Sequence, residues 1–227
     1  MASVRARLAS FLIGIATALA IVAVVLPLFL NPVFVAFEQD RSEARAWTGF
    51  SAADLRTATD AILFDLVVGP PDFDVELGGT PVLSERERSH MRDVRAVFTG
   101  FFAAAIVVAV LAVVLVVRRG RAGRAASWRS VRAGAIGLVV GLVVVGGVAF
   151  VAFDALFEVF HLIFFPGGTY TFDPATERLV QLFPFQFWQE TAVAVGVVAA
   201  VVAIVVGFVA GRAIRRAERI GADGSPT

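Results

Sequence analysis

Apolar residues are concentrated in four runs that contain no Asp, Glu, Arg or His: Leu8–Phe37, Ala96–Val117, Ala133–Phe153 and Thr191–Gly211. A helix needs about 20 such residues to cross about 30 Å of hydrocarbon, and each run is long enough. Pro27, Asn31 and Pro32 break the first run. We therefore expect an all-α polytopic membrane protein, a single membrane domain over 1–227, with spans at about 8–30, 96–117, 133–153 and 191–211.

The first run follows Arg5 and Arg7, as the apolar part of a secretion signal does. It continues well past the 7–15 apolar residues that are typical of a cleaved signal. We interpret it as a retained membrane anchor.

Charge is distributed asymmetrically between the expected loops. The loop 118–132 contains six arginines and no acidic residue, whereas 31–95 contains twelve acidic residues and seven arginines, a net charge of −5. The loop 154–190 contains five acidic residues and one arginine, a net charge of −4. Basic loops stay in the cytoplasm, so both termini, the loop 118–132 and the tail 212–227 are expected there, with both acidic loops outside. The basic loop is a topology signal on this interpretation and predicts no nucleic-acid partner.

The first outer loop is expected to fold into a helical cap. From Phe50 to Gly69, apolar residues recur at helical spacing, with Ser51 as N-cap. Gly78-Gly79 is suited to the turn of a short β-hairpin. Ser84 and Glu87 form an S-x-x-E capping box, which begins a helix that continues into the second span. The apolar side of the expected helix at 50–69 contains Leu55, Ala58, Ile62 and Leu66.

The second outer loop begins with an apolar stretch that extends the third helix, lying in or just above the outer leaflet, until Pro166-Gly167-Gly168 ends it. Asp173-Pro174 predicts a turn, and an aromatic belt precedes the fourth span. Some of the arginines at the start of the second span are expected to reach lipid phosphates; the four candidates are Arg86, Arg88, Arg92 and Arg95.

The chain has two histidines and no cysteine. The expected topology places His90 and His161 on the same outer side, next to different spans. Imidazole suits proton transfer near neutral pH because its ordinary pKa is about 6.5. The absence of cysteine excludes a thiolate nucleophile, a cysteine-ligated metal and a disulfide.

Each histidine follows a glutamate by three residues, Glu87 and Glu158, which lie on the same helical face as their histidines. Two such pairs also occur in di-metal carboxylate sites, which need further carboxylates, for example from Asp60, Asp65 or Asp154. A metal-dependent enzyme is therefore one alternative. A non-catalytic lipid-binding or assembly protein is another.

The segments SERERSHMRDVRAVF and FHLIFFPGGTYTFDPATERLVQLFPFQFW resemble the signature blocks of a family of four-helix bacterial membrane proteins, the lipoprotein intramolecular transacylases. The resemblance implies that the sn-2 acyl chain of a diacylglyceryl-cysteine lipoprotein moves to the cysteine α-amine. It implies His90 and His161 as catalytic residues. It also implies a bacterial cytoplasmic membrane, with the active face outside. It requires no cofactor, no metal and no obligate protein partner beyond the lipoprotein and membrane lipids.

Seven further residues are expected around this chemistry. Glu158 is expected to orient His161, with Glu87 and Asp173 as further supporting residues. Oxyanion or substrate contacts are expected from Tyr170, Arg178, Arg92 and Trp188.

Two histidines that act on one ester–amine centre must lie close together. We expect their ring nitrogens within about 4–8 Å, since each must come within hydrogen-bond reach of the substrate. Their pocket is expected to have Phe, Leu, Ile and Val walls and to open sideways to lipid.

Overall fold

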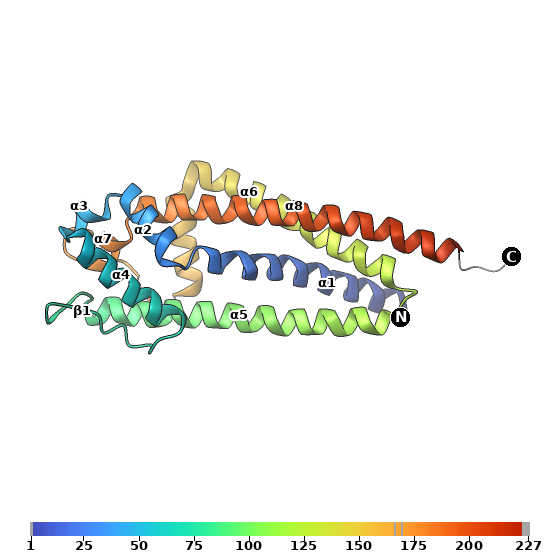
Figure 1. Ribbon diagram of the computed structural model, residues 1–227, viewed down its shortest axis with the longest axis horizontal. Helices are drawn as coiled ribbons and strands as arrows, with labels where there is room; N and C mark the ends of the chain where they lie inside the picture. Colours follow the sequence, from blue (N-terminus) through green and yellow to red (C-terminus); the bar gives the residue numbers. More distant parts are fainter. Residues whose placement is uncertain (1, 166, 169, 224–227) are drawn as a thin grey trace. The chain divides into compact units, whose positions relative to one another are not determined.

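The computed structural model describes residues 2–165, 167, 168 and 170–223, which are mostly helical (Figure 1). Within these residues four helices are long and apolar enough to cross a membrane. They are α1 (Ala2–Val25), α5 (Glu85–Arg119), α6 (Arg124–Phe164) and α8 (Phe185–Asp223). The predicted fold class is confirmed: an all-α membrane protein with four transmembrane helices.

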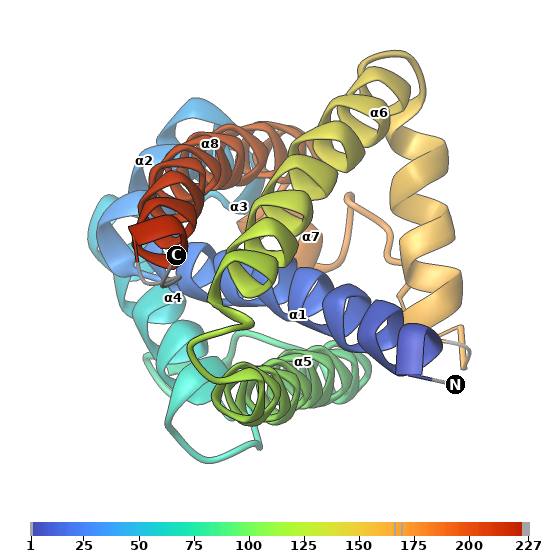
Figure 2. The same cartoon turned by 90° about the vertical axis from the view of Figure 1, so that its right-hand side faces the viewer.

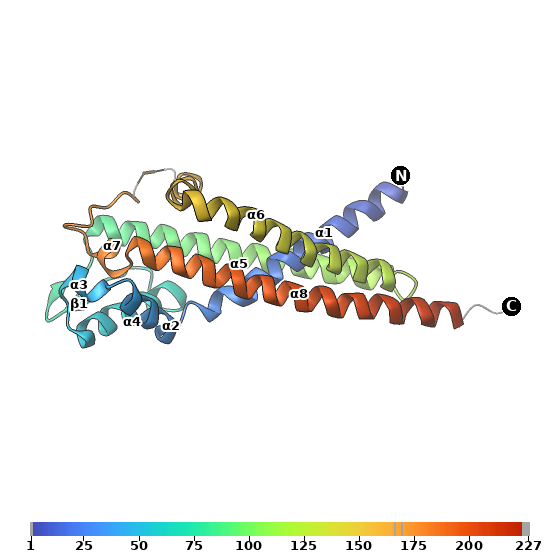
Figure 3. The ribbon, with the colours of Figure 1, turned by 90° about the horizontal axis from the view of Figure 1, so that it is seen from above.

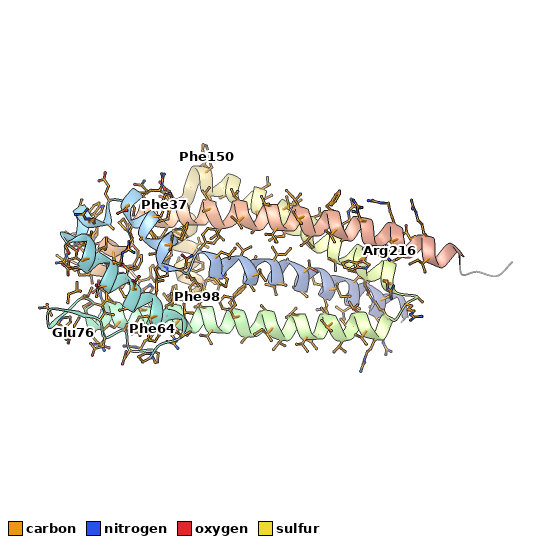
Figure 4. All side chains as sticks on the ribbon, in the orientation of Figure 1. Phe37, Phe64, Glu76, Phe98, Phe150 and Arg216 are labelled. Atoms are coloured by element: carbon orange, nitrogen blue, oxygen red, sulfur yellow. The ribbon has the colours of Figure 1, made fainter. Side chains whose placement is uncertain are left out.

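The long helices expose apolar side chains over most of their length. In the most apolar 18-residue stretch of each helix, at most 22% of the residues are buried within the protein. Phe150 of α6, labelled in Figure 4, is 91% exposed. A water-soluble protein rarely exposes so large an apolar surface, and lipid covers it at no cost. The chain is therefore a multi-pass membrane protein.

Internal contacts divide the chain into two compact units. The first, here called the helix unit, contains α1, the segment Phe101–Gly147 and residues 196–223. The second, here called the cap unit, contains Leu26–Gly100 and Val148–Val195. Both histidines lie in the cap unit, so the site is formed within one unit.

In the helix unit, α1 crosses α6 at two glycines (Figure 3). A Cβ atom built on Gly134 would lie 2.2 Å from the carbonyl oxygen of Gly14, so no larger residue fits at this crossing. Arg119 of α5 donates to Ser10 Oγ of α1 at 2.9 Å, and Arg129 of α6 pairs with Glu218 of α8 at 2.9 Å. Close helix approach through small residues is the usual way in which membrane helices pack.

The cap unit contains the short elements (Figure 1), and most of them pack around one apolar core. These are η1 (Leu26–Leu28), α2 (Pro32–Arg41), α3 (Ala44–Thr48), α4 (Ala52–Val67), β1 (Glu76–Leu77), β2 (Thr80–Pro81) and α7 (Arg178–Leu182). Phe73, Ile62 and Leu182 are among the most completely buried side chains in this core. Because α7 is part of the second outer loop, this core joins the two loops that the sequence places outside.

Two predicted cap elements are confirmed. Ser51 Oγ accepts a hydrogen bond from the Asp54 backbone N–H at 3.1 Å, and Leu55, Ala58 and Ile62 of α4 are buried. The hairpin pairs β1 with β2 through Gly78 and Gly79, whose φ angles of 58° and 79° favour glycine.

Helices α2, α3 and α7 were not predicted. Helix α2 begins where the sequence predicted a break, because Asn31 caps it by accepting from Val33 N at 3.0 Å and Pro32 occupies its first turn. Its buried Gln39 donates to Thr59 Oγ1 at 3.0 Å and to the carbonyl of Leu182 at 2.9 Å. This buried side chain links α2 to α4 and to the end of α7.

Helix α6 bends at Ala152, whose backbone is non-helical, with φ −151° and ψ 50° (Figure 2). The bend falls next to Phe153, where the sequence predicted that the third span ends. Residues after the bend continue as helix to Phe164 and carry His161. Pro166, the predicted end of this extension, lies outside the described residues.

Candidate active site

The first turn of α5 fixes the position of His90 through a capping box. The Ser84 backbone N–H donates to Glu87 Oε2 at 2.7 Å, and the Glu87 N–H donates to Ser84 Oγ at 3.3 Å. The predicted Ser84–Glu87 capping box is confirmed. His90 follows Glu87 by one helical turn and is 6% exposed.

Glu87 also holds a second helix. Its other oxygen, Oε1, accepts a hydrogen bond from the backbone N–H of Leu179 at 2.6 Å. Leu179 is in the first turn of α7, where backbone N–H groups have no partner within the helix. One buried carboxylate therefore caps α5 and α7 together.

His161 lies on α6 after the bend and is 8% exposed. Its Nδ1 lies 2.7 Å from the carbonyl oxygen of Phe157, one turn earlier. A carbonyl can only accept, so Nδ1 carries the proton. In the neutral ring Nε2 then has the free lone pair.

The two imidazole rings are neighbours although 71 positions separate them in the sequence. Their centroids lie 6.0 Å apart and their planes are inclined by 22°. The predicted proximity of His90 and His161 is confirmed. The predicted lateral opening of the pocket towards lipid stays a prediction.

Aromatic rings surround the pair on several sides. Phe165 contacts both histidines, with centroid distances of 4.8 Å to His90 and 5.4 Å to His161. Phe172 lies 5.4 Å from the ring of His90, and Phe157 lies 4.2 Å from that of His161. These side chains exclude water from the two rings, as the sequence predicted for an apolar wall.

Tyr170 is one of the predicted substrate-contact residues that the structure brings to the pair. Its ring centroid lies 4.9 Å from that of His161. Phe157 lies between Trp188 and His161. The ring centroids of Trp188 and Phe157 are 6.4 Å apart, and Phe157 contacts His161.

Arg86, one of the four candidates for contact with lipid phosphate, holds the segment that carries Phe172. Its guanidinium donates to both oxygens of Glu177, at 2.5 and 2.6 Å, and to the carbonyl of Thr171 at 2.9 Å. It also lies over the Phe172 ring, 4.8 Å from the centroid. Sequence reasoning missed this role, although the arginine is within the SERERSH motif.

The three other candidates for contact with lipid phosphate also have protein partners. Arg88 pairs with Asp74 at 3.0 Å, and Arg92 pairs with Glu85 at 2.6 Å. Arg95 donates to the carbonyl of Gly69 at 2.6 Å, near the end of α4. Acidic and carbonyl groups of the cap lie within reach of these arginines, and their contact with lipid phosphates stays a prediction.

Two predicted oxyanion donors make other contacts in the structure. Arg92 forms the ion pair with Glu85 described above. Arg178 donates to the carbonyl of Thr48 at 2.9 Å and to Gln181 Oε1 at 2.8 Å. It therefore joins α7 to the end of α3.

Asp173 and Glu158 support the site differently from one another. Asp173 Oδ1 accepts from Ala175 N at 2.9 Å, which stabilises the predicted turn before α7. Glu158 is exposed, and the residues that the structure describes show no hydrogen bond or ion pair between it and His161. The group that orients His161 is the carbonyl of Phe157 and not the predicted carboxylate.

The metal alternative needs both Glu-x-x-His pairs in one cluster. Among residues 2–165, 167, 168 and 170–223, no group of three or more His, Asp or Glu side chains is arranged to hold a metal ion. Both oxygens of Glu87 already accept backbone hydrogen bonds, from Ser84 and Leu179. The two pairs contribute their histidines to one place but not their carboxylates.

The arrangement is suited to acid–base chemistry in apolar surroundings. His161 presents a lone pair at Nε2, as argued above. His90 Nδ1 is buried and has no hydrogen-bond partner among the described residues. A buried polar atom without a partner costs free energy unless a ligand supplies one.

Comparison with known proteins gives two positive results. The family model described as lipoprotein intramolecular transacylase Lit matches residues 9–188. In meso structures of the membrane integral lipoprotein intramolecular transacylase Lit from Bacillus cereus superpose on 96% of this chain. One has a TM-score of 0.74 at 17% identity and 99% coverage of its own chain. A histidine-to-alanine variant of that protein has a TM-score of 0.76 at 16% identity and 97% coverage.

A comparison with curated proteins found no match. At 16–17% identity the solved structures show a shared fold. The family match is stronger, since it spans well over half of the chain and includes both histidines. The chain belongs to the family of the lipoprotein intramolecular transacylase Lit.

Proposed function

We propose that this protein transfers an acyl chain within one lipoprotein molecule. The substrate is a lipoprotein whose N-terminal cysteine carries a diacylglyceryl thioether. The sn-2 chain moves from its glycerol ester to the cysteine α-amine. The product is an N-acyl lipoprotein with a free glycerol hydroxyl.

The observation that carries this proposal is the placement of His90 beside His161, with ring centroids 6.0 Å apart, in a buried aromatic site. Membership of the transacylase family supports the same reaction. The nucleophile and the ester belong to one substrate, so the enzyme needs no nucleophile of its own. Holding the two groups together supplies a large part of the rate increase.

The first step is attack of the α-amine nitrogen on the ester carbonyl carbon. The Nε2 atom of His161 accepts the proton that the amine loses, because Nδ1 is already protonated and bonded to Phe157. A C–N bond forms and the carbonyl π electrons move to oxygen. In this proposal Tyr170, whose ring lies beside His161, donates a hydrogen bond to this oxyanion.

The second step is collapse of the tetrahedral intermediate. The C–O bond to glycerol breaks, and the alkoxide takes a proton from the ring of His90 while His90 receives the proton held by His161, so no imidazolate forms. Both rings are therefore neutral before the next turnover. The net change is one acyl group moved from oxygen to nitrogen and one proton moved from nitrogen to oxygen.

The surrounding rings protect the ester from hydrolysis. Water would compete with the amine for the carbonyl carbon, and Phe157, Phe165 and Phe172 limit its access to the two imidazoles. The same rings offer contact area for acyl chains.

The membrane and the side on which the reaction occurs form part of the proposal. The arginine-rich loop 118–132 supports a cytoplasmic position for itself, and the acidic loops that carry both histidines then face outward. A lipoprotein in the outer leaflet of a bacterial cytoplasmic membrane would meet the site from that side. The whole chain acts as a single membrane domain on this view.

The reaction can be tested with purified protein and a synthetic diacylglyceryl-cysteine lipopeptide. Substrate and product have the same mass, but mild alkali removes both ester-linked chains from the substrate and leaves the amide-linked chain on the product. Mass spectrometry after alkali treatment should find one retained chain. Without protein it should find none.

A crossover experiment tests the intramolecular step. Two lipopeptides that differ in peptide mass and in chain length are mixed with the protein. The proposal predicts that each peptide keeps its own chain length. Products with exchanged chains would contradict it.

A doubly substituted His90→Ala/His161→Ala protein separates catalysis from the non-catalytic alternative. The catalytic proposal predicts no alkali-stable chain above the level without protein, although the protein still inserts and runs as a single species on size exclusion. Retained transfer would show that the histidines are not the catalytic groups.

A further inference from the structure

The helix unit contains an apolar groove that the proposed reaction does not use. It has a volume of about 270 Å³ and lies between α6 and α8. Ala135, Val139, Ala203 and Phe208 are among the residues that line it. The groove is formed within one unit, separate from the unit that carries the histidines.

Small residues create the groove. Ala135 and Ala203 are each 1% exposed, so the two helices approach closely there. A Cβ atom built on Gly207 would lie 3.8 Å from the Cβ of Ala135, which is an ordinary contact distance. Because Gly207 has no side chain, space is left beside the contact between α6 and α8. The surrounding surface otherwise carries large apolar side chains.

Arginines lie at one end of the groove. Arg132 of α6 is one of its lining residues. One turn beyond Gly207, a second hollow of about 270 Å³ is lined by four arginines of α8: Arg212, Arg215, Arg216 and Arg219. Arg216 is labelled on these last turns in Figure 4.

Gly211 brings the two helices' arginines together. A Cβ atom at this position would lie 3.8 Å from Arg132 Nε and 3.9 Å from Arg215 Nη1. Two guanidinium groups near one point repel each other unless an anion lies between them. In the described part of the chain neither arginine forms an ion pair, whereas Arg129 on the same helix pairs with Glu218.

We propose that this groove binds one anionic phospholipid, with an acyl chain between α6 and α8 and the phosphate held by Arg132 and Arg215. Apolar length beside paired guanidinium groups matches a molecule that has both a chain and an anionic head. A free phosphate would use the arginines and leave the groove without an occupant. Arginine is suited to the head because its planar fork can donate two hydrogen bonds to phosphate oxygens.

The position of the site agrees with the charge pattern of the chain. The arginines of α8 belong to the tail 212–227, which the sequence predicts on the cytoplasmic side. Anionic lipids give that leaflet its negative surface potential, and each nearby arginine adds to the attraction. The ligand is a structural lipid and not the lipoprotein substrate, since the predicted reaction takes place on the other side.

The test is native mass spectrometry of the full chain in detergent, with phosphatidylglycerol or phosphatidylcholine of identical chains added at equal concentration. The proposal predicts that one phosphatidylglycerol stays bound at collision energies that remove phosphatidylcholine. The Arg132→Gln/Arg215→Gln protein should bind phosphatidylglycerol about tenfold more weakly, because two charge-assisted hydrogen bonds are lost. Arg129→Gln serves as the control, since this arginine already has a carboxylate partner.

A second pair of variants tests the groove itself. Gly207→Leu places a side chain in the groove and should weaken binding of phosphatidylglycerol about tenfold. Gly141→Leu is the matched control, because no atom lies within 4 Å of a Cβ at Gly141 and the leucine would point to bulk lipid. Circular dichroism and size exclusion confirm that all four proteins are folded.

Three results would overturn the proposal. Equal retention of the two lipids would remove the headgroup preference. Unchanged binding by the arginine variant would remove the phosphate contact. Weakened binding by Arg132→Gln/Arg215→Gln together with unchanged binding by Gly207→Leu would leave surface charge attraction alone, without a chain in the groove.

Discussion

The carboxylate of Glu87 accepts a hydrogen bond from the backbone N–H of Leu179 at 2.6 Å, across 92 positions of sequence. It also accepts from Ser84 N at 2.7 Å, so both oxygens are used. Glu87 is one turn before His90. The first turn of the helix that carries one histidine is thereby fixed to the segment that follows the other.

Replacing Glu87 by alanine should destabilise the protein, because two backbone N–H groups lose their acceptor. An unsatisfied buried donor costs about 1–3 kcal/mol. Thermal unfolding in detergent should show a lower midpoint for Glu87→Ala than for Glu87→Gln, whose amide oxygen still accepts one bond. Glu85→Ala, in the same turn but exposed, should change the midpoint less. Equal midpoints for Glu85→Ala and Glu87→Ala would contradict the capping role.

Arg86→Lys tests the contact that holds Phe172 beside His90. Lysine keeps the charge but cannot bond both Glu177 oxygens and the Thr171 carbonyl with one planar group. Transfer to the lipopeptide amine should fall by about 10- to 100-fold, as expected for displacement of groups around a reacting centre. Arg88→Lys, two positions along and paired with Asp74, is the control and should fall less. Wild-type rates in Arg86→Lys would show that the segment around Phe172 does not shape the site.

Glu158→Gln should retain nearly full transfer activity. His161 is oriented by the carbonyl of Phe157, and the exposed Glu158 contributes no hydrogen bond to it in the described structure. Initial rates on the lipopeptide measure this directly. A loss comparable to that of His161→Ala would restore the orienting role that the sequence suggested for Glu158.

The crossing of α1 and α6 predicts that alanine substitution lowers the stability of the protein at Gly134 but not at Gly137. Gly134→Ala adds a methyl group that would meet the Gly14 carbonyl oxygen at 2.2 Å. Overpacking of this kind costs about 1–3 kcal/mol, so the unfolding midpoint should fall. Gly137→Ala, one turn later with no atom within 4 Å, should leave it unchanged or raise it slightly. A similar fall for both would place the effect in the helix backbone and not in the crossing.

Glu38 is expected to make the stability of the cap unit depend on pH. Burial, and then a hydrogen bond with Glu190, raise the pKa of its carboxyl above 4.5. The folded protein therefore binds this proton more tightly than the unfolded chain, and the contribution of Glu38 to stability falls as pH rises through that raised pKa. Glu38→Gln should be more stable than wild type at pH 8, and this difference should shrink as pH falls towards 4. Asp40→Asn, exposed on the same helix, is the control. A difference that does not change with pH would contradict the raised pKa.

The transmembrane helices could be predicted from sequence because their signal is local: a long apolar run has few alternatives to a helix in lipid. The same holds for the Ser51 cap, the Gly78-Gly79 turn and the Ser84–Glu87 capping box, which involve residues three or fewer positions apart. Helices α3 and α7 are five residues each and depend on tertiary packing around Leu182 and Ala44, which no local pattern shows.

At the site, the sequence predicted the two histidines and their common side, but not the contacts that fix them. The charge pattern predicted that His90 and His161 lie on the same side of the membrane. It did not predict the distance between them, which was expected only from their joint action on one substrate. The acceptor for His161 is a backbone carbonyl, which every residue has, so no side-chain motif marks it. Phe165 and Phe172 were part of an expected apolar wall, and only the fold shows that they contact the histidines.

The most direct measurement is the alkali-stable acyl chain on lipoprotein N-termini from cells that carry wild-type, His90→Ala or His161→Ala protein as their only lipoprotein N-acylating enzyme. Membrane levels of the three proteins are matched by immunoblot, with Asp40→Asn as a control at an exposed position. The account predicts an amide-linked chain with wild type and Asp40→Asn, and none with either histidine variant. An amide-linked chain at the wild-type level in His90→Ala or His161→Ala cells would contradict joint catalysis by the two histidines.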